Sequence, residues 1–305
     1  MKLRFDVERT QPDPFVFEDN GKFYMYVTAS EGVEAYSTDD LFGEWHFEGV
    51  VASVENGKGY WAPSIIKLEN RYYLYFSCKK GENFQFMHVM SSDSALGPFK
   101  NPKCLYDYFS IDSHVVKTDS GLFLWFARNG DVGERIGTRV CVDRLVDPYT
   151  PAYEVRDVVL ATLDEEQYTP SYRKDFPWHT IEGAFWFREG DWQYLMYSGG
   201  CYENDTYHVG YAKAKTDESD LLRIDFVKCE NGEKFAPVLI KNDFEEGTGH
   251  HSVIKHKGQY YAVYHARDVK NESNTVGYTE RRTARICKLH VNNGEIIAER
   301  YKNRL

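Results

Sequence analysis

Aromatic and aliphatic residues gather in five short runs along the chain, each four or five residues long. The runs begin at Phe23, Tyr72, Leu122, Tyr194 and Tyr260. Runs of this length and composition, bounded by turn residues, are typical of buried β-strands. A turn signal such as Asp19-Asn20-Gly21 precedes every run, and Asn, Asp and Gly tolerate the positive φ of tight hairpin turns. The pattern predicts that each run is the second strand of a hairpin.

A second short apolar strand lies upstream of each turn and starts with a polar or small residue. These segments read DPFVF from Asp13, APSII from Ala62, DSHVV from Asp112, EGAFW from Glu182 and HHSVI from His250. One hairpin unit therefore occurs five times, with starts spaced 49, 50, 70 and 68 residues apart. A period near 50 residues with several strands per unit indicates a β-propeller. The two long spacings place insertions at about 128–181 and 199–249.

Hairpins alone would also suit an ordinary β-sandwich. The spacing inside the unit favours the propeller: an aromatic residue follows the start by eleven residues in four units, and by twelve in the unit at Glu182. We therefore predict an all-β, five-bladed β-propeller that forms one domain over residues 1–305. Helix is expected to be scarce, because no stretch shows a 3.6-residue apolar period with caps.

Composition narrows the classes of partner. The 305 residues contain 37 Lys and Arg against 47 Asp and Glu, a formal charge of -10, so a nucleic acid is not an expected partner. No apolar stretch reaches 18 residues, which argues against a membrane span. The first residues show no apolar signal region and the six cysteines form no CxxC pair, so we expect a cytoplasmic protein with reduced thiols. A homo-oligomer is compatible with these features.

The starts of the five units carry the candidate chemistry. In a propeller the innermost strand of each blade lines the central channel, so its first residues are expected to meet at one mouth. The five residues are Asp13, Ala62, Asp112, Glu182 and His250. Buried like charges raise each other's pKa and cost free energy unless they do chemistry or bind a cation. Each residue alone could be a turn former, but three carboxylates at one repeat position predict an acidic site.

Glycoside hydrolysis is the chemistry that uses separated carboxylates in this way. One carboxylic acid protonates the leaving oxygen, and an ionised carboxylate activates water from the opposite face of the sugar. A third carboxylate near the acid would raise its pKa and orient it. Trp61 directly precedes Ala62 and is a candidate to pack on a sugar face, although it could equally be a core residue between blades.

Taken together, these segments resemble glycoside hydrolase family 43, five-bladed β-propeller enzymes that act on arabinose- and xylose-containing glycans. The segments that carry the resemblance are QPDPFVFEDNGKFYMYVTAS, YWAPSII, SIDSHVVKTDSGLFLWFA, TIEGAFWF and GTGHHSVI. The resemblance implies that Asp13 is the general base, Asp112 the carboxylate that tunes and orients the acid, and Glu182 the general acid.

The resemblance also suggests two further contacts. His250 matches a histidine at the channel centre that touches a calcium ion or its water in many members. Calcium prefers six to eight oxygen ligands, so a structural histidine bonded to Asp13 or to a neighbouring backbone is an equal alternative. Arg281 is the candidate substrate-binding arginine, with Arg282 the alternative, because one residue of slip in a strand reverses which side chain points inward.

Within the family, the expected activity is that of an inverting, exo-acting α-L-arabinofuranosidase that releases terminal arabinose from arabino-oligosaccharides. A β-xylosidase or an endo-arabinanase of the same fold is the alternative, and a propeller that binds sugar without catalysis is a more distant one. The insertions at 128–181 and 199–249, for example from Tyr168 to Trp178, are expected to wall off the pocket. No cofactor is expected to be required for the chemistry.

Overall fold

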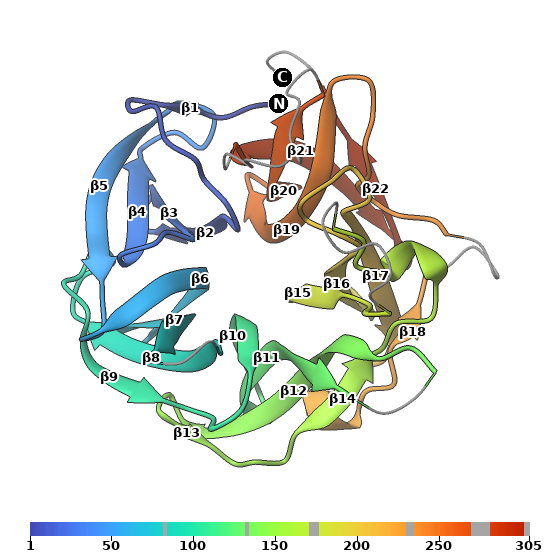
Figure 1. Ribbon diagram of the computed structural model, residues 1–305, viewed down its shortest axis with the longest axis horizontal. Helices are drawn as coiled ribbons and strands as arrows, with labels where there is room; N and C mark the ends of the chain where they lie inside the picture. Colours follow the sequence, from blue (N-terminus) through green and yellow to red (C-terminus); the bar gives the residue numbers. More distant parts are fainter. Residues whose placement is uncertain (82–83, 132–133, 171–176, 230–234, 270–280, 302–305) are drawn as a thin grey trace.

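Five β-sheets are arranged in a ring in the computed structural model of the chain (Figure 1). The structure describes residues 1–81, 84–131, 134–170, 177–229, 235–269 and 281–301. Over these ranges the only helical elements are two 3₁₀ turns, η1 (Asp164–Glu166) and η2 (Leu221–Arg223). None of the helices described is long and apolar enough to cross a membrane. The predicted all-β, five-bladed propeller is confirmed.

Each blade is one sheet, and its strands follow chain order from the ring centre outwards, with exceptions in blades 1 and 3. Blade 1 consists of β2 (Phe15–Asp19), β3 (Lys22–Val27), β4 (Val33–Thr38), β5 (Glu44–Ala52) and β1 (Arg4–Phe5). Blade 2 consists of β6 (Gly57–Leu68), β7 (Arg71–Lys80), β8 (Phe86–Ser92) and β9 (Lys100–Cys104). Blade 3 consists of β10 (Ser110–Thr118), β11 (Gly121–Gly130), β12 (Gly137–Asp147), β13 (Thr150–Pro151) and β14 (Arg156–Val159). Blade 4 consists of β15 (Ile181–Glu189), β16 (Trp192–Gly199), β17 (His208–Lys215) and β18 (Val227–Lys228). Blade 5 consists of β19 (Glu245–His256), β20 (Gln259–Asp268), β21 (Thr283–Asn292) and β22 (Glu295–Glu299). The exceptions to chain order are β1, which forms the outer edge of blade 1, and β13 and β14, which both pair with β12 in blade 3.

The hydrophobic core lies between the blades. Five clusters of buried side chains each combine residues of two neighbouring blades. Tyr26 of β3 meets Phe76 of β7 in one cluster, for example, and Trp125 of β11 meets Leu195 of β16 in another. The aromatic runs of the sequence therefore fill the interfaces between blades, where large flat side chains bury the most apolar area.

Residues 1–5 join the first blade to the last. The backbone N–H of Leu3 donates to the carbonyl of Ala284, 3.1 Å away, and that of Ile286 donates to the carbonyl of Met1 at 2.8 Å. The next two residues, which form β1, pair in parallel with β5 of blade 1. Blades 1 and 5 are thus connected by backbone hydrogen bonds on both sides of one short segment.

The innermost strands share a local distortion at the mouth of the ring. Four of them carry a register shift there: β6, β10, β15 and β19. Each innermost strand has a left-handed φ at its repeat position, which in blade 1 lies just before the strand: 53° at Asp13, 43° at Ala62, 61° at Asp112, 61° at Gly183 and 45° at His250. An extra residue in a left-handed conformation bends a strand and redirects the adjacent side chains. The repeat position of blade 4 is therefore Gly183, and Glu182 precedes it by one residue, which explains its twelve-residue spacing.

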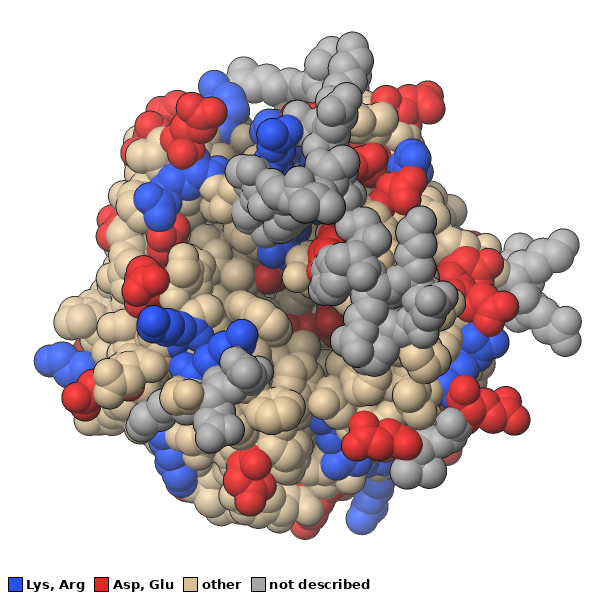
Figure 2. All heavy atoms as spheres, in the orientation of Figure 1, with Lys and Arg blue, Asp and Glu red and all other residues tan. Residues whose placement is uncertain are grey.

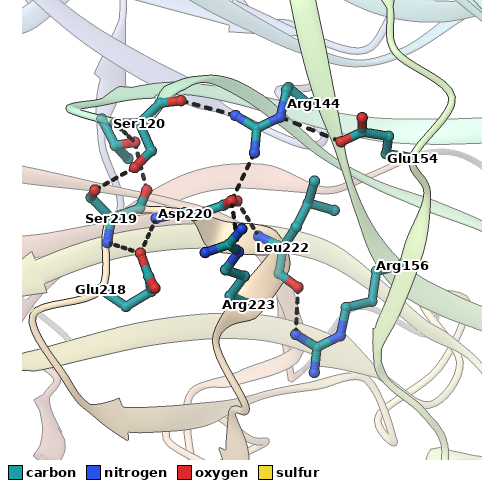
Figure 3. A network of polar contacts seen from close by, with 10 residues as sticks. Ser120, Arg144, Glu154, Arg156, Glu218, Ser219, Asp220, Leu222 and Arg223 are labelled. Carbon is teal, nitrogen blue, oxygen red and sulfur yellow. Dashed lines mark hydrogen bonds and ion pairs between the residues drawn. The ribbon is translucent and has the colours of Figure 1, made fainter.

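A segment between β17 and β18, residues 218–225, attaches blade 4 to blade 3 (Figure 3). We call it the latch. The Arg144 guanidinium donates to Asp220 Oδ2 at 2.8 Å, and Arg156 Nη1 donates to the carbonyls of Leu222 at 2.8 Å and Ile224 at 3.0 Å. This part of the insertion 199–249 binds the neighbouring blade and does not wall off the pocket, so the prediction for that insertion holds only for its first residues, as described below.

Candidate active site

The side chains at the starts of the innermost strands meet in one cavity of about 120 Å³. Asp13, Asp112, Glu182 and His250 all line it, so four of the five predicted residues converge. The fifth, Ala62, contributes its backbone N–H, which donates to Thr28 Oγ1 at 2.8 Å. Figure 2 shows acidic atoms in the hollow at the centre of the ring. Six other residues complete the lining: Thr28, Trp61, Ile111, Tyr202, Tyr207 and Arg282.

Asp13 is surrounded by groups that stabilise its ionised form. Thr28 Oγ1 donates to Asp13 Oδ2 at 2.5 Å, and Arg282 Nη1 donates to Oδ1 at 3.2 Å. His265 Nδ1 lies 3.1 Å from Oδ1, and His250 Nδ1 lies 3.6 Å from it. Burial alone would raise the pKa of this carboxyl, but His250, Arg282 and His265 together hold the pKa well below its usual range. Asp13 is therefore ionised at neutral pH.

Asp112 and Glu182 have the opposite electrostatic environment. Burial and the neighbouring carboxylates of Glu182 and Asp13 raise the pKa of Asp112 well above its usual range, although the Gly183 N–H donates to Asp112 Oδ2 at 3.0 Å. Burial raises the pKa of Glu182 to about 7, and the Asp13 charge adds to the rise, while the Tyr207 hydroxyl and Arg282 oppose it. This pair of carboxyls consequently retains a proton near neutral pH.

His250 lies between the carboxylates, 3.6 Å from Asp13 Oδ1 and 3.7 Å from Asp112 Oδ2 through its Nδ1. One ligand atom each from Asp112, Glu182 and His250 lie within 4.8 Å of one another. Calcium prefers six to eight oxygen ligands, whereas this group supplies two carboxylates and an imidazole nitrogen. The donor set therefore does not fit a calcium ion.

Three more buried histidines pack beside the site. Burial lowers the pKa of His114 and of His251 to about 3 and that of His265 to about 4. The His114 ring stacks on Phe185 with centroids 4.0 Å apart, and its Nδ1 accepts from the Trp186 N–H at 3.0 Å. At neutral pH these imidazoles are uncharged, so His265 acts on Asp13 through a hydrogen bond and none of the three adds positive charge to the site.

Of the two residues predicted to contact the sugar, Trp61 lies at the cavity and Arg281 does not. Trp61 lines the cavity and is 37% exposed, so the alternative that it is a core residue between blades is wrong. Arg282 lines the cavity, with its guanidinium 4.9 Å from the Tyr202 ring centre, whereas Arg281 lies in a separate hollow beside residues 2–11. The assignment to Arg281 is therefore wrong. Neighbouring residues point to opposite sides of an extended chain, and the inward side falls to Arg282.

Comparison with known proteins identifies the family. The model of the glycosyl hydrolases family 43 matches residues 7–296. The chain belongs to glycosyl hydrolase family 43. A Bacteroides ovatus "Xylosidase/arabinosidase" is 26% identical, with 93% of each chain covered. A probable arabinan endo-1,5-alpha-L-arabinosidase C of Aspergillus clavatus is 21% identical over 83% of this chain and 81% of that protein. The crystal structure of a thermostable family-43 glycoside hydrolase superposes with a TM-score of 0.81 at 24% identity, covering 96% of this chain and 93% of that one.

This family-43 chain draws part of its site from residues that show no repeat pattern. Tyr202 and Tyr207 come from the loop between β16 and β17, the first part of the insertion 199–249. Thr28 follows β3, and His265 lies on β20. Sequence reasoning missed these residues because the unit predicts strand positions, not loop contents. Of the stretch from Tyr168 to Trp178 expected at the pocket, residues 171–176 lie outside the described residues.

Proposed function

We propose that this family-43 glycoside hydrolase is an inverting, exo-acting α-L-arabinofuranosidase, with Glu182 as general acid and Asp13 as general base. The observation that carries the proposal is that two buried carboxyls in one cavity have shifted pKa values in opposite directions. The pKa of Glu182 is raised to about 7, and that of Asp13 is held far below its usual range. Two carboxyls whose environments push their pKa values apart provide an acid and a base at the same pH.

The chemistry follows from these protonation states. Glu182 transfers its proton to the glycosidic oxygen as the bond to the anomeric carbon breaks. Asp13 takes a proton from the attacking water on the opposite face, so the configuration at the anomeric carbon inverts. Arg282 and Thr28 hold Asp13 ionised and oriented for this step. Asp112 lies in the same cavity, and the charge of Glu182 raises the pKa of Asp112, so the pair of carboxyls retains a proton.

Cavity size supports a terminal sugar as the substrate. A cavity of about 120 Å³ suits a single sugar ring better than a stretch of polysaccharide. Trp61 and Tyr202 supply aromatic faces on which the C–H face of a pentose can pack. Arabinosides are the proposed substrate class, since arabinose occurs in the names of both curated relatives described above. The partner is accordingly an arabinose- or xylose-containing oligosaccharide.

β-Xylosidase activity is the second candidate, because the relative from Bacteroides ovatus is named for both sugars. A panel of nitrophenyl α-L-arabinofuranoside, nitrophenyl β-xyloside and dyed arabinan separates the candidates. The proposal predicts fastest cleavage of the arabinofuranoside. Faster cleavage of the xyloside would favour the second candidate, and internal cuts in arabinan without action on the small arabinoside would refute exo action.

Two variants and one spectroscopic measurement test the mechanism. Glu182→Gln and Asp13→Asn should lose turnover while the fold is retained. Glu189→Gln is the matched control, since Glu189 lies at the other end of the same strand β15 and pairs with Lys255 at 2.8 Å. Proton NMR of the first-formed anomer should show inversion. Net retention would refute the role of Asp13 as base, and full activity of Glu182→Gln would indicate a different acid.

A further inference from the structure

Tyr207 is a buried residue whose hydroxyl reaches the candidate acid. It is 1% exposed, and its hydroxyl donates to Glu182 Oε1 at 2.7 Å. Burial and the nearby carboxylates of Glu182, Asp112 and Asp13 raise the pKa of the Tyr207 hydroxyl well above its usual range. The hydroxyl therefore keeps its proton over the working range of pH. Because this donor occupies Oε1, the proton that Glu182 transfers is placed on Oε2.

The chain holds the Tyr207 ring in a fixed slot. The ring lies parallel to that of His265, at an interplanar angle of 7° with centroids 5.6 Å apart. On another side it packs against the backbone at Gly249, where an added Cβ would lie 2.0 Å from Tyr207 Cε1. A side chain at position 249 would displace the ring, so glycine at this position leaves the space that Tyr207 fills.

This packing links the two proposed catalytic carboxyls. Tyr207 contacts Glu182 through its hydroxyl, and His265 Nδ1 lies 3.1 Å from Asp13 Oδ1. The stacked pair thus forms a continuous path of contacts from the acid to the base. The loop before β17 supplies one ring and β20 of the next blade supplies the other, so the path also crosses the interface between blades 4 and 5.

We propose that Tyr207 is a positioning residue, which orients the Glu182 carboxyl and confines its transferable proton to Oε2. The inference rests on the proposed function, in which Glu182 is the general acid. Among the described residues, the titratable groups that face Glu182 include Tyr207, Asp112, Asp13, His250, Arg282 and Cys201. Among them Tyr207 donates a hydrogen bond directly to the acid and is uncharged, so its hydroxyl can be removed without changing the net charge of the site.

The test compares leaving groups in Tyr207→Phe. Nitrophenolate leaves with little protonation, whereas the sugar hydroxyl of an arabino-oligosaccharide needs the acid. We expect kcat/KM for the oligosaccharide to fall by about tenfold or more, and that for the nitrophenyl glycoside by less than about threefold. A hydrogen bond to a carboxylate favours its ionised form, so the basic limb of the pH profile should also move up by about one pH unit.

Tyr264→Phe is the matched control. Tyr264 is also fully buried and donates to a buried carboxylate, Glu245 Oε1, at 2.8 Å, but it lies outside the cavity lining. The Tyr264→Phe variant should be less stable, but its kcat/KM should not depend on the leaving group and the basic limb of its pH profile should not move. Gly249→Ala should reproduce the Tyr207→Phe behaviour by displacing the ring. The inference is refuted if Tyr207→Phe loses the same factor on both substrates and its basic limb stays in place.

A wrong assignment of Glu182 as the acid would give different experimental results from a wrong assignment of Tyr207. Unimpaired cleavage of the oligosaccharide by Glu182→Gln would overturn the acid assignment itself. If Glu182→Gln is inactive on the oligosaccharide but Tyr207→Phe behaves like Tyr264→Phe, the acid assignment stands and the positioning role of Tyr207 is wrong. The comparison applies equally if the wild-type enzyme prefers xylosides, since the matching nitrophenyl xyloside and xylo-oligosaccharide then replace the arabinosides.

Discussion

Asp220 of the latch allows the attachment of blade 4 to blade 3 to be tested quantitatively. Its carboxylate is 14% exposed and accepts from the 27% exposed Arg144 at 2.8 Å, and it also accepts from the Leu222 N–H at 3.2 Å as the N-cap of η2. Asp220→Asn removes the charge but keeps a capping side chain, because Asn caps as well as Asp. Asp220→Ala removes both.

The expected losses follow from these two contacts, because the third, an ion pair with the 74% exposed Arg223 at 3.3 Å, contributes little. A partly buried, charge-assisted hydrogen bond contributes about 2 kcal/mol to the free energy of unfolding, and a cap adds about 1 kcal/mol. At about 2 °C per kcal/mol for a chain of this size, the Tm should fall by about 4 °C in Asp220→Asn and about 6 °C in Asp220→Ala. Thermal unfolding followed by circular dichroism measures both, while kcat/KM at 25 °C should be unchanged in each.

Glu154→Gln is the control for this series. Glu154 pairs with the same Arg144, but at 3.4 Å and with 57% of its side chain exposed, so its loss should cost less than about 0.5 kcal/mol. If Asp220→Asn melts no lower than Glu154→Gln, the latch contributes no measurable stability. A fall in kcat/KM of either Asp220 variant would instead connect this segment to the active site.

Three further predictions concern the site itself. Because Glu182 must be protonated to act and its pKa is raised to about 7, kcat/KM should fall tenfold per pH unit above about pH 7, and Glu182→Gln should lower turnover of oligosaccharides by a factor of about 10² to 10⁴ at the optimum. Arg282 lowers the pKa of Glu182, so Arg282→Gln should move the basic limb of the pH profile to higher pH, whereas Arg282→Lys should leave it in place. If the basic limb falls at the same pH in the two variants, this electrostatic role of Arg282 is wrong. Gly183→Ala and Gly190→Ala both place alanine at φ near 60°, which costs about 1 kcal/mol of folding free energy each, so both variants should lose a similar amount of thermal stability. Only the Cβ at position 183 would approach His250 Nδ1, at 3.4 Å, so only Gly183→Ala should lower kcat/KM.

The repeat unit accounts for how much of the fold could be predicted. Each hairpin requires a two-residue side-chain period and a turn with positive φ, and both are local properties that the sequence displays directly. The positions of Asp13, Asp112 and His250 follow from the same unit, because the first residues of every innermost strand meet at one mouth. Even Glu182, which precedes its blade's repeat position by one residue, remains close enough to line the cavity.

The remaining site residues depend on tertiary contacts that leave no local pattern. Tyr207 is one tyrosine among 23, and its role depends on the slot beside Gly249 and His265, which lie in another blade. The choice between Arg281 and Arg282 depends on which side of the chain faces the cavity just before β21. Register of this kind is set by pairing with β20, so the sequence alone leaves both orientations open.

The neutral histidines beside the site give the enzyme a sharp lower limit of pH. His114, His251 and His265 have pKa values of about 3, 3 and 4 in the folded chain, against about 6.5 when unfolded. The unfolded chain therefore binds more protons, and folded stability falls as the pH drops below about 6.5, by about 2 kcal/mol per histidine at pH 5. The three together cost about 6 kcal/mol at pH 5, and the raised pKa values of Glu182 and Asp112 offset part of this loss because these carboxyls bind protons more readily in the folded chain. Asp13 stays ionised far below this range, so acid should stop the enzyme by cooperative unfolding, with several protons taken up at once, before it protonates the base.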